Sequence, residues 1–422
     1  MGAAAQDPKP PNQVPSSLEQ VKSRPLVREV SKVEEFVSTA HDFSIVTGGP
    51  VYDFLFRIGL VRLGLPNVLR RIIALIVLTW LPLLILSVTS GLAFGHQVKI
   101  PFIYDYSMYA RFLLALPLLV LAEIVIDPAI RSAVQDFVDD GIVQEKELSK
   151  FEEVLRKTQR LRDSAIPELL LLVLAFAPTF LFQPEWGLAA ASSWHTIAHK
   201  LSPAGWWFAT ISAPILRFLI YRWLFRYFIW ALLLWRIIRL GLHLIPTHPD
   251  RAAGLGFLSL TQGRFGILFC AFGCIFAGRV VNGLVYDGTH LASFKFLMAG
   301  FLVLSVIVGL FPLTLLAPKM AEVRRLGLRE YGKLGNQYTE SFDLRWVHPT
   351  EPPSEPLLGT GDIQSLADLG NSYAIIEEMS IAPITKMLTV QLAVQAGVPL
   401  IPVIILGTPT TELVNAILKM VV

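Results

Sequence analysis

Long apolar stretches separated by short polar segments dominate the chain from about residue 71 onward. Six of them approach or exceed the roughly 20 residues that a helix needs to cross a bilayer, namely 71–93, 108–128, 167–182, 206–234, 265–285 and 296–316. A weaker seventh stretch covers 387–406, and the pattern leaves open whether it crosses the membrane or forms a hairpin. The pattern predicts an all-α fold, a polytopic helical membrane bundle of six or seven transmembrane helices.

Two charged segments between these stretches also keep helical periodicity. In 131–163, apolar residues recur at helical spacing among charged ones and Gly141 marks a break, which predicts a cytoplasmic helical hairpin. In 318–386, a helix continues from the sixth stretch to about residue 346 and is followed by a Pro-rich linker. We therefore expect helical cytoplasmic extensions on a six-helix bundle that occupies 71–317.

The two ends of the chain differ from this central part. Residues 1–45 are rich in Pro, Ser and charge, which is typical of a disordered segment, and we expect no secretory signal peptide there. Residues 46–70 form a cytoplasmic or interfacial lead-in to the bundle. Residues 387–422 hold the seventh stretch and then an amphipathic helix, 411–422, whose single apolar face suits the membrane surface.

Composition supports a membrane location. With 53% hydrophobic and 16% charged residues, a soluble fold would expose a large apolar surface, so the lipid bilayer is the expected partner. The net charge of +3 is too small to favour nucleic acid. Cys270 and Cys274 lie one helical turn apart in an apolar stretch and are expected to be packing residues, not a disulfide or a metal site. No cofactor is predicted.

The distribution of Lys and Arg orients the bundle. Three short loops hold one Lys apiece: 91–107, 183–205 and 287–295. The N-terminal segment and three further segments each hold several Lys or Arg: 130–166, 236–264 and 318–386. By the positive-inside rule this second group lies in the cytoplasm, which places the N-terminus there as well.

Ionisable residues inside the apolar stretches are costly and mark candidate sites. Arg222 and Glu123 lie at the same predicted depth, 16 residues or about 24 Å along two helices that run in the same direction. Arg226 and Asp127 follow one turn further along the same helices. We predict two stacked ion pairs, Arg222 with Glu123 and Arg226 with Asp127. The alternatives are a purely structural role in fixing helix register and snorkelling of the arginines to lipid phosphates.

Two further intramembrane arginines lack an obvious partner in the sequence. Arg217 lies closer to the midplane, with no acid at its depth in the predicted spans. Arg279 in the fifth span lies near Asn282 and Asp287 at its outer end. Such residues usually face a cavity or pathway, so both are functional candidates, and for Arg279 the alternative is snorkelling to the headgroups.

The cytoplasmic loop after the fourth span concentrates five candidate residues in a short sequence: His248, Asp250, Arg251, Gly254 and Gly256. In an enzyme, His248 would be a general base and Asp250 its orienting acid, which a spacing of two residues permits only in extended backbone. Asp250 is equally suited to cap the next helix or to accept from Arg251, and the glycines permit turns or close packing. The alternative is a rigid connector that docks on the cytoplasmic helices.

His195 and His199 form a weak candidate metal site in the outer loop before the fourth span. On a helix their spacing of four residues would place both imidazoles on one face, as zinc requires. No third ligand is evident, and the neighbouring Trp194 favours an interfacial helix instead. We therefore predict no metal.

Three sequence blocks resemble a family of bacterial polytopic inner-membrane proteins: Pro246-Thr-His-Pro-Asp-Arg-Ala-Ala-Gly-Leu-Gly-Phe257, Leu328-Arg-Glu-Tyr-Gly-Lys-Leu-Gly335 and Leu358-Gly-Thr-Gly-Asp-Ile-Gln-Ser-Leu-Ala-Asp-Leu-Gly370. The resemblance covers roughly residue 71 to the C-terminus and leaves the N-terminal segment outside. It implies a bacterial inner-membrane location and no particular activity.

For function, the recurrence of arginine at several depths favours a channel or transporter-like protein with a polar path for a small anion. One alternative is a membrane scaffold or sensor with purely structural ion pairs. The second is a membrane-embedded enzyme that uses His248 and Asp250, which the lack of a catalytic constellation disfavours. A second copy of the chain, in a homo-oligomer, is a further candidate partner.

Overall fold

The computed structural model describes residues 43–57, 65–95, 97–181, 193–197, 200–351, 356–357 and 359–408. The structure is 77% helical, which confirms the all-α class. In chain order the helical elements are α2 (Pro50–Arg57), α3 (Leu65–Thr79), α4 (Leu81–Thr89), η1 (Phe102–Tyr104), α5 (Tyr106–Tyr109), η2 (Ala110–Ala115), α6 (Leu116–Asp139), η3 (Glu145–Glu147), α7 (Leu148–Asp163), α8 (Ala165–Leu181), α9 (Pro203–Trp207), η4 (Phe208–Ser212), α10 (Ala213–Ile237), α11 (Phe257–Arg264), α12 (Gly266–Tyr286), α13 (Leu291–Thr314), α14 (Ala317–Phe342), η5 (Asp343–Val347), α15 (Asp362–Glu377), α16 (Lys386–Gly397), η6 (Val398–Leu400) and α17 (Ile401–Gly407).

Six helical segments of the described chain are long and apolar enough to cross a membrane: Asn67–Thr89, Tyr106–Asp139, Pro203–Ile237, Phe257–Tyr286, Leu291–Thr314 and Lys386–Gly407. Helices suit this role because they satisfy their own backbone hydrogen bonds in lipid. Large apolar side chains remain exposed on the outer surfaces, among them Phe296 at 85% and Leu169 at 63%. Exposing such apolar surfaces to water is unfavourable, so the chain is a helical membrane protein whose bundle contacts lipid.

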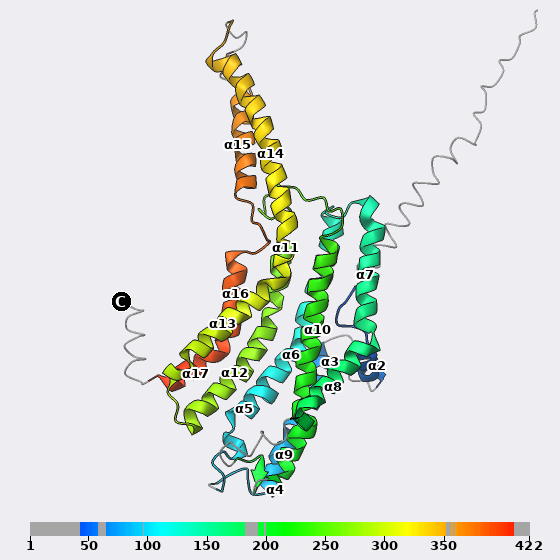
Figure 1. Ribbon diagram of the computed structural model, residues 1–422, viewed down its shortest axis with the longest axis vertical. Helices are drawn as coiled ribbons and strands as arrows, with labels where there is room; N and C mark the ends of the chain where they lie inside the picture. The colour runs from blue at the N-terminus through cyan, green and yellow to red at the C-terminus, as the bar shows by residue number, and fades with distance from the viewer. Residues whose placement is uncertain are drawn as a thin grey trace, which may run out of the picture.

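Two helices organise the bundle, as Figure 1 shows. The long helix α10 packs against α6, α7, α8 and α13. Its counterpart α12 packs against η2, α6, α13 and α16. Neighbouring spans run alternately toward one end of the molecule and the other, which places the loops in two layers at opposite ends (Figure 1).

Two of the predicted spans differ in length from what the sequence indicated: the third is too short to count among the six spans, and the seventh is long enough to count. The helix α8 has 17 residues, of which Ala165–Thr179 form a short apolar helix below the length of the six spans. By contrast, α16, η6 and α17 form one helical segment of 22 residues that continues through Pro399 and Pro402. The segment 387–406 is therefore a single helix and not a hairpin. The two prolines are tolerated because each lies at the start of a helical element.

The predicted cytoplasmic extensions are helical. The hairpin expected at 131–163 consists of the end of α6 and of α7, and Gly141 between them has a positive φ of 68°. The elements α14 and η5 continue beyond the end of the bundle, and α15 returns beside α14 (Figure 1). We call α14, η5 and α15 the α14–α15 hairpin.

The boundary of the N-terminal segment is wrong by a few residues. Phe43, Ser44 and Ile45 were expected to be disordered, yet each is buried to 99% or more. They are buried because Phe43 and Ile45 pack into the core, while Ser44 between them donates a hydrogen bond to the buried carboxylate of Asp127. Residues 1–42, and the amphipathic helix expected at 411–422, lie outside the described residues.

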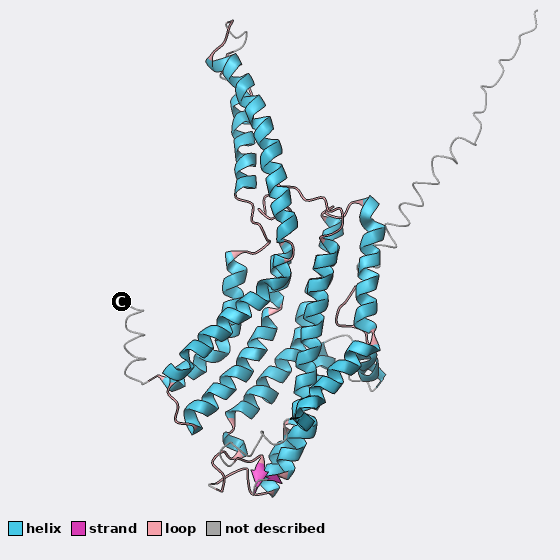
Figure 2. Ribbon diagram, in the orientation of Figure 1, coloured by secondary structure: helices cyan, strands magenta, loops and turns pink. Residues whose placement is uncertain are grey.

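A small β-hairpin closes the end of the bundle opposite to the α14–α15 hairpin, as Figure 2 shows. Its strands β1 (Thr196–Ile197) and β2 (Lys200–Leu201) are antiparallel and pair Thr196 with Leu201. The interfacial helix predicted around Trp194 is therefore wrong. Trp194 is instead fully buried, and its indole N–H donates to Asp105 at 2.9 Å, which holds this loop against the first turn of α5.

Candidate functional site

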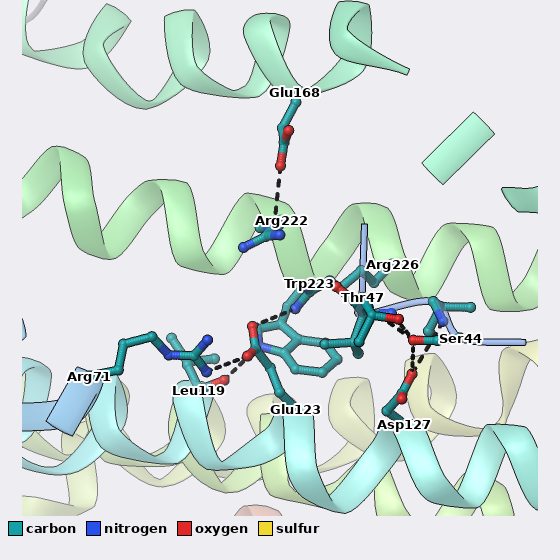
Figure 3. A network of polar contacts seen from close by, with 12 residues as sticks. Ser44, Thr47, Arg71, Leu119, Glu123, Asp127, Glu168, Arg222, Trp223 and Arg226 are labelled. Atoms are coloured by element: carbon teal, nitrogen blue, oxygen red, sulfur yellow. Dashed lines mark hydrogen bonds and ion pairs between the residues drawn. The ribbon is translucent and has the colours of Figure 1, made fainter. Parts of the chain in front are cut away.

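Five charged side chains meet between four helices, and Figure 3 shows their arrangement. We call them the arginine network: Arg71 of α3, Glu123 of α6, Glu168 of α8, and Arg222 and Arg226 of α10. Glu123 is central, because one of its oxygens lies 3.0 Å from Nη1 of Arg226 and the other binds Nη2 of Arg71. Oε1 of Glu168 lies 3.5 Å from Nε of Arg222. The network thus joins four helices at one depth.

The predicted ion pairs have the wrong partners. Arg226 pairs with Glu123, Arg222 pairs with Glu168, and Asp127 pairs with Arg131 one turn further along α6 at 2.9 Å. The prediction assumed that both helices start at the same depth on the outer side. In the structure Arg226 lies 23 residues after the start of its span at residue 203, whereas Glu123 lies 17 residues after residue 106. The helical segment Pro203–Ile237 therefore begins further from the network than Tyr106–Asp139 does.

A strap of the chain, residues 43–49, covers the network. Ser44 Oγ donates to Oδ1 of Asp127 at 2.5 Å. Arg226 Nη2 donates to the carbonyl oxygen of Val46 at 3.1 Å. Asp127 and Arg226 thereby have partners that come from outside the spans, so the strap is part of the electrostatic balance of the bundle interior.

A cavity of about 430 Å³ lies beside the network, between α3, α6, α8 and α10. We call it the pocket. Its charged lining residues are Arg71, Glu123 and Arg222, and the other eleven lining residues are apolar. This volume falls within the range of small-molecule sites in proteins, roughly 300–1,000 Å³.

The pocket is charged at one end and apolar along its length. On α3 its lining runs from Arg71 to Leu78, and on α10 from Arg222 back to Pro214. These seven and eight residues correspond to about 10 and 12 Å along the helices. Half of the hydrocarbon core of a bilayer is about 15 Å thick. The pocket thus matches the polarity and length of a lipid molecule in one leaflet.

The mouth of the pocket faces sideways. Leu78 of α3 and Leu172 of α8 both line it, and they are 44% and 41% exposed. Because α3 packs on α6 while α8 packs on α10, the pocket lies between two helix pairs. In a membrane this mouth opens toward lipid tails and not toward water.

The charged end of the pocket carries an excess of positive charge. The network has three guanidinium groups and two carboxylates, which leaves one positive charge over. Arg226 is well satisfied, since it also lies over the ring of Trp223 at 4.9 Å. By contrast, Nε of Arg71 is buried without a hydrogen-bond partner among the described residues. Among the residues that the structure describes, the one polar contact of Arg222 is with Glu168. Its distance of 3.5 Å is long for a hydrogen bond. Both arginines are more than nine-tenths buried.

The other two candidate arginines lie away from the pocket lining. Nη1 of Arg217 donates to the carbonyl oxygen of Ala175 at 2.9 Å and lies 3.3 Å from Oγ1 of Thr179, so this arginine binds the backbone of α8. Arg279 is exposed on α12, seven residues from the end of that helix. An arginine about 10 Å from a helix end reaches the headgroup region with its long side chain.

The cytoplasmic loop is organised by Asp250. Its carboxylate accepts hydrogen bonds from the backbone N–H groups of Ala252, Gly254 and Gly256 at 2.8–3.2 Å. Nδ1 of His248 lies 2.7 Å from the same carboxylate. Burial alone would raise the pKa of Asp250, but these hydrogen bonds outweigh it and hold the pKa below its ordinary value. The carboxylate that an enzyme would use to orient His248 thus already binds the loop backbone.

Backbone geometry explains the glycines of this loop. Gly254 has a positive φ of 93°, and a Cβ at Gly256 would lie 2.9 Å from Oδ2 of Asp250. Arg251 also adopts a positive φ, of 53°, while its side chain pairs with Glu378 at 3.0 Å. The pairing with Glu378 docks the loop beside the base of α15, which is the arrangement of a rigid connector.

Of the two histidines in the predicted pair, His195 is among the described residues. His195 stacks on Trp194 with ring centroids 3.7 Å apart, and burial lowers its pKa to about 4, so it is neutral near pH 7. His199 lies outside the described residues. Among the residues that the structure does describe, no group of three or more His, Cys, Asp or Glu is arranged to hold a metal ion.

Sequence analysis missed three members of this site. Arg71 stands beside Arg70 at the edge of a span, where basic residues ordinarily flank a membrane helix. Glu168 is the acid in the first turn of an otherwise apolar helix, and that isolation was a usable signal. Ser44 gave no signal, since its bond to Asp127 joins residues 83 positions apart.

Comparison of the chain with protein-family models, with curated proteins and with solved structures gives no match.

Proposed function

We propose that this membrane protein binds a singly charged anionic amphiphile that it takes from the bilayer. The head of the amphiphile would lie between Arg71 and Arg222, and its chain would lie along the apolar walls formed by α3, α8 and α10. The observation that carries the proposal is the excess positive charge, on two buried and incompletely bonded arginines, at one end of a largely apolar pocket.

Physical reasons favour this class of ligand over others. A buried cation without its full set of partners costs several kcal/mol, and an anionic head would supply the missing acceptors. Apolar walls and a sideways mouth suit an acyl chain and disfavour a small hydrated anion, which would lose its water shell. A head with one negative charge balances the network, because three guanidiniums and two carboxylates leave one charge over.

The test is binding of a fluorescent long-chain carboxylate to the purified protein in nanodiscs of neutral phospholipid. Its methyl ester serves as the uncharged analogue. We expect the carboxylate to bind at least tenfold more tightly than the ester, and Arg222→Gln to remove most of that difference. Equal binding of the acid and the ester would contradict the proposal.

A matched pair of variants separates pocket binding from general effects on folding. Ala74 lines the pocket, so Ala74→Trp fills it without removing a charge. Ile73 is its neighbour on α3 and is 52% exposed away from the pocket lining, so Ile73→Trp is the control. We expect Ala74→Trp alone to abolish carboxylate binding, with a melting temperature close to that of the wild type.

A transporter-like role would add movement of this ligand between leaflets. The alternative, a polar path for small anions along several arginines, makes a different demand, because Arg217 would then be needed for flux. Liposome flux separates the two: Arg217→Ala should leave amphiphile movement unchanged but would abolish small-anion flux through a polar path. The position of Arg217 on the α8 backbone, outside the pocket lining, favours the amphiphile.

For location, we infer the inner membrane of a bacterium from the family that the three sequence blocks resemble. The Lys and Arg distribution supports a cytoplasmic N-terminus and a cytoplasmic α14–α15 hairpin. Labelling of single cysteines with an impermeant maleimide in intact cells tests this orientation. A cysteine at Lys333 should stay unlabelled until the cells are opened.

A further inference from the structure

Glu168 contacts the arginine network from outside the pocket. It lies in the first turn of α8, and its Oε1 is 3.5 Å from Nε of Arg222. It does not belong to the lining of the pocket but lines a second cavity of about 20 Å³, together with Val46 of the strap and Arg222. Arg222 thus lies between the two cavities, and in Figure 3 Glu168 and Glu123 lie on opposite sides of it.

The Glu168 carboxylate is held in place by α2 and the strap. Its Oε2 accepts a hydrogen bond at 2.9 Å from the backbone N–H of Val51, in the first turn of α2. A Cβ at Gly49 would lie 3.3 Å from the same oxygen, so the strap packs closely against it. The side chain is 12% exposed. Glu168 therefore contributes a negative charge at a fixed position and does not occupy the space of a ligand head.

Glu168 leaves part of Arg222 available to a ligand. The carboxylate contacts the Nε edge of the guanidinium group, and the two terminal nitrogens have no hydrogen-bond partner among the residues that the structure describes. Such a fork can bind two oxygens of a carboxylate or of a phosphate. Its geometry thus admits carboxylates, phosphodiesters and phosphomonoesters alike. These heads differ in charge, because a phosphomonoester carries about two negative charges above pH 7 and the others carry one.

We propose, on the basis of the proposed binding of an anionic amphiphile, that Glu168 determines which head charge the pocket accepts. With Glu168 in place, the arginine network has one positive charge over, and a head with one negative charge balances it. A second negative charge on the head would be buried among apolar walls without a cation to compensate it, which is costly. The substrate class is therefore amphiphiles with monoanionic heads, carboxylates or phosphodiesters, and phosphomonoesters are rejected.

Two ion pairs beside the network are balanced within themselves. Asp127 pairs with Arg131 at 2.9 Å, and Asp163 pairs with Arg162 at 2.7 Å. Neither pair adds to the excess charge at the head of the pocket. Removal of the Glu168 charge therefore raises this excess from one positive charge to two, which suits a phosphomonoester.

The experiment measures binding of two ligands with the same alkyl chain to the full-length protein in nanodiscs of neutral phospholipid. Dodecyl phosphate carries about two negative charges at pH 8, and its monomethyl ester carries one. We expect the wild type to bind the monomethyl ester about tenfold more tightly, and Glu168→Gln to reverse this preference. Glu168→Asp keeps the charge and should keep the preference of the wild type. Partitioning into lipid, measured with empty nanodiscs, is the same for all variants and cancels when their affinity ratios are compared.

A second pair of variants adds a positive charge and leaves Glu168 unchanged. Leu172 lies one turn after Glu168 on α8 and lines the pocket, whereas Leu170 is 64% exposed and lies outside the lining. Leu172→Lys should also shift the preference toward dodecyl phosphate, and Leu170→Lys, the matched control, should not. This pair provides the test if the melting temperature shows that Glu168→Gln does not fold.

The role of Glu168 is refuted if the wild type binds both phosphates equally, or if the folded Glu168→Gln protein keeps the preference of the wild type. If Glu168→Gln does not fold, an unchanged preference in Leu172→Lys refutes it. The uncharged dimethyl ester separates these results from failure of the proposed function. When this ester binds as tightly as both anions, the pocket does not recognise anions and both proposals fail. When the monoanion is preferred to it but the variants change nothing, the role of Glu168 alone is wrong.

Discussion

Glu123 and Arg226 form a direct ion pair across α6 and α10, with Oε1 and Nη1 separated by 3.0 Å. The other oxygen of Glu123 binds Arg71, so one carboxylate compensates two buried cations. Glu123→Gln leaves both arginines undercompensated, and we expect a loss of about 3–5 kcal/mol in the free energy of unfolding. Thermal unfolding in detergent measures it, with Glu153→Gln on the exposed face of α7 as a control whose effect should be much smaller. Equal effects of the two substitutions would mean that the network adds nothing to stability.

Ser44 joins the strap to the bundle through several hydrogen bonds. Its hydroxyl donates to Asp127 and accepts from the backbone N–H groups of Val46 and Thr47 at 3.0 and 2.9 Å. Ser44→Ala removes all three, and we expect a loss of about 1–3 kcal/mol together with faster proteolysis of the strap. The control is Ser341→Ala, at an exposed position on α14, which should be close to neutral. An unchanged cleavage rate at the strap would refute this role of Ser44.

The cytoplasmic loop should depend on pH through Asp250. Its pKa is lower in the folded protein than the value of about 3.9 in an unfolded chain. The stability that the ionised carboxylate contributes is therefore fully present above about pH 4 and is lost as the pH falls through the folded value. Amide hydrogen exchange of Ala252, Gly254 and Gly256, corrected for the intrinsic effect of pH, should accelerate as the pH falls below about 4. Asp250→Asn, which cannot ionise, should exchange faster at neutral pH and lack this acid step.

Close packing between α12 and the second span depends on a glycine. A Cβ at Gly278 would lie 2.5 Å from Cβ of Ala110 and 3.0 Å from Cα of Ser107. Gly278→Ala should therefore force the helices apart and cost about 1–3 kcal/mol. Gly300→Ala on α13 meets no atom within 4 Å and should be neutral or slightly stabilising, because alanine favours the helix. Similar melting temperatures for the two variants would contradict this account.

Sequence patterns predicted the spans well and their relative depths poorly. Apolar length determines whether a helix can cross a bilayer, so most spans followed from composition alone. The depth of one helix relative to the next is determined by the loops and by packing. The offset between the segments Tyr106–Asp139 and Pro203–Ile237 was therefore not visible in the sequence. Arg226 was correctly identified as an unusual intramembrane residue, but its partner was displaced by one turn of α6.

The candidate site, too, was predictable in part from the sequence. Charged residues in apolar stretches are identifiable because they are rare there, as Glu123 and Arg222 illustrate. The pocket required the side chains of four helices to be placed together, and the contribution of Glu168 from α8 depended on a helix whose bounds were the least certain. The strap contact at Asp127 depended on tertiary structure alone.

The strap also has a consequence for the order in which the protein is assembled. Val46 is synthesised 180 residues before Arg226, whose side chain donates a hydrogen bond to the carbonyl oxygen of Val46. At the usual rate of synthesis, roughly 5–20 residues per second, this interval lasts about 9–36 seconds. During that time the strap has no binding partner on α10, and the arginines that it helps to compensate have not yet entered the membrane. The earliest described part of the chain to be synthesised thus reaches its contact with Arg226 only after α10 has been made. The interval before α10 inserts is therefore the period in which a chaperone or a protease has access to the strap.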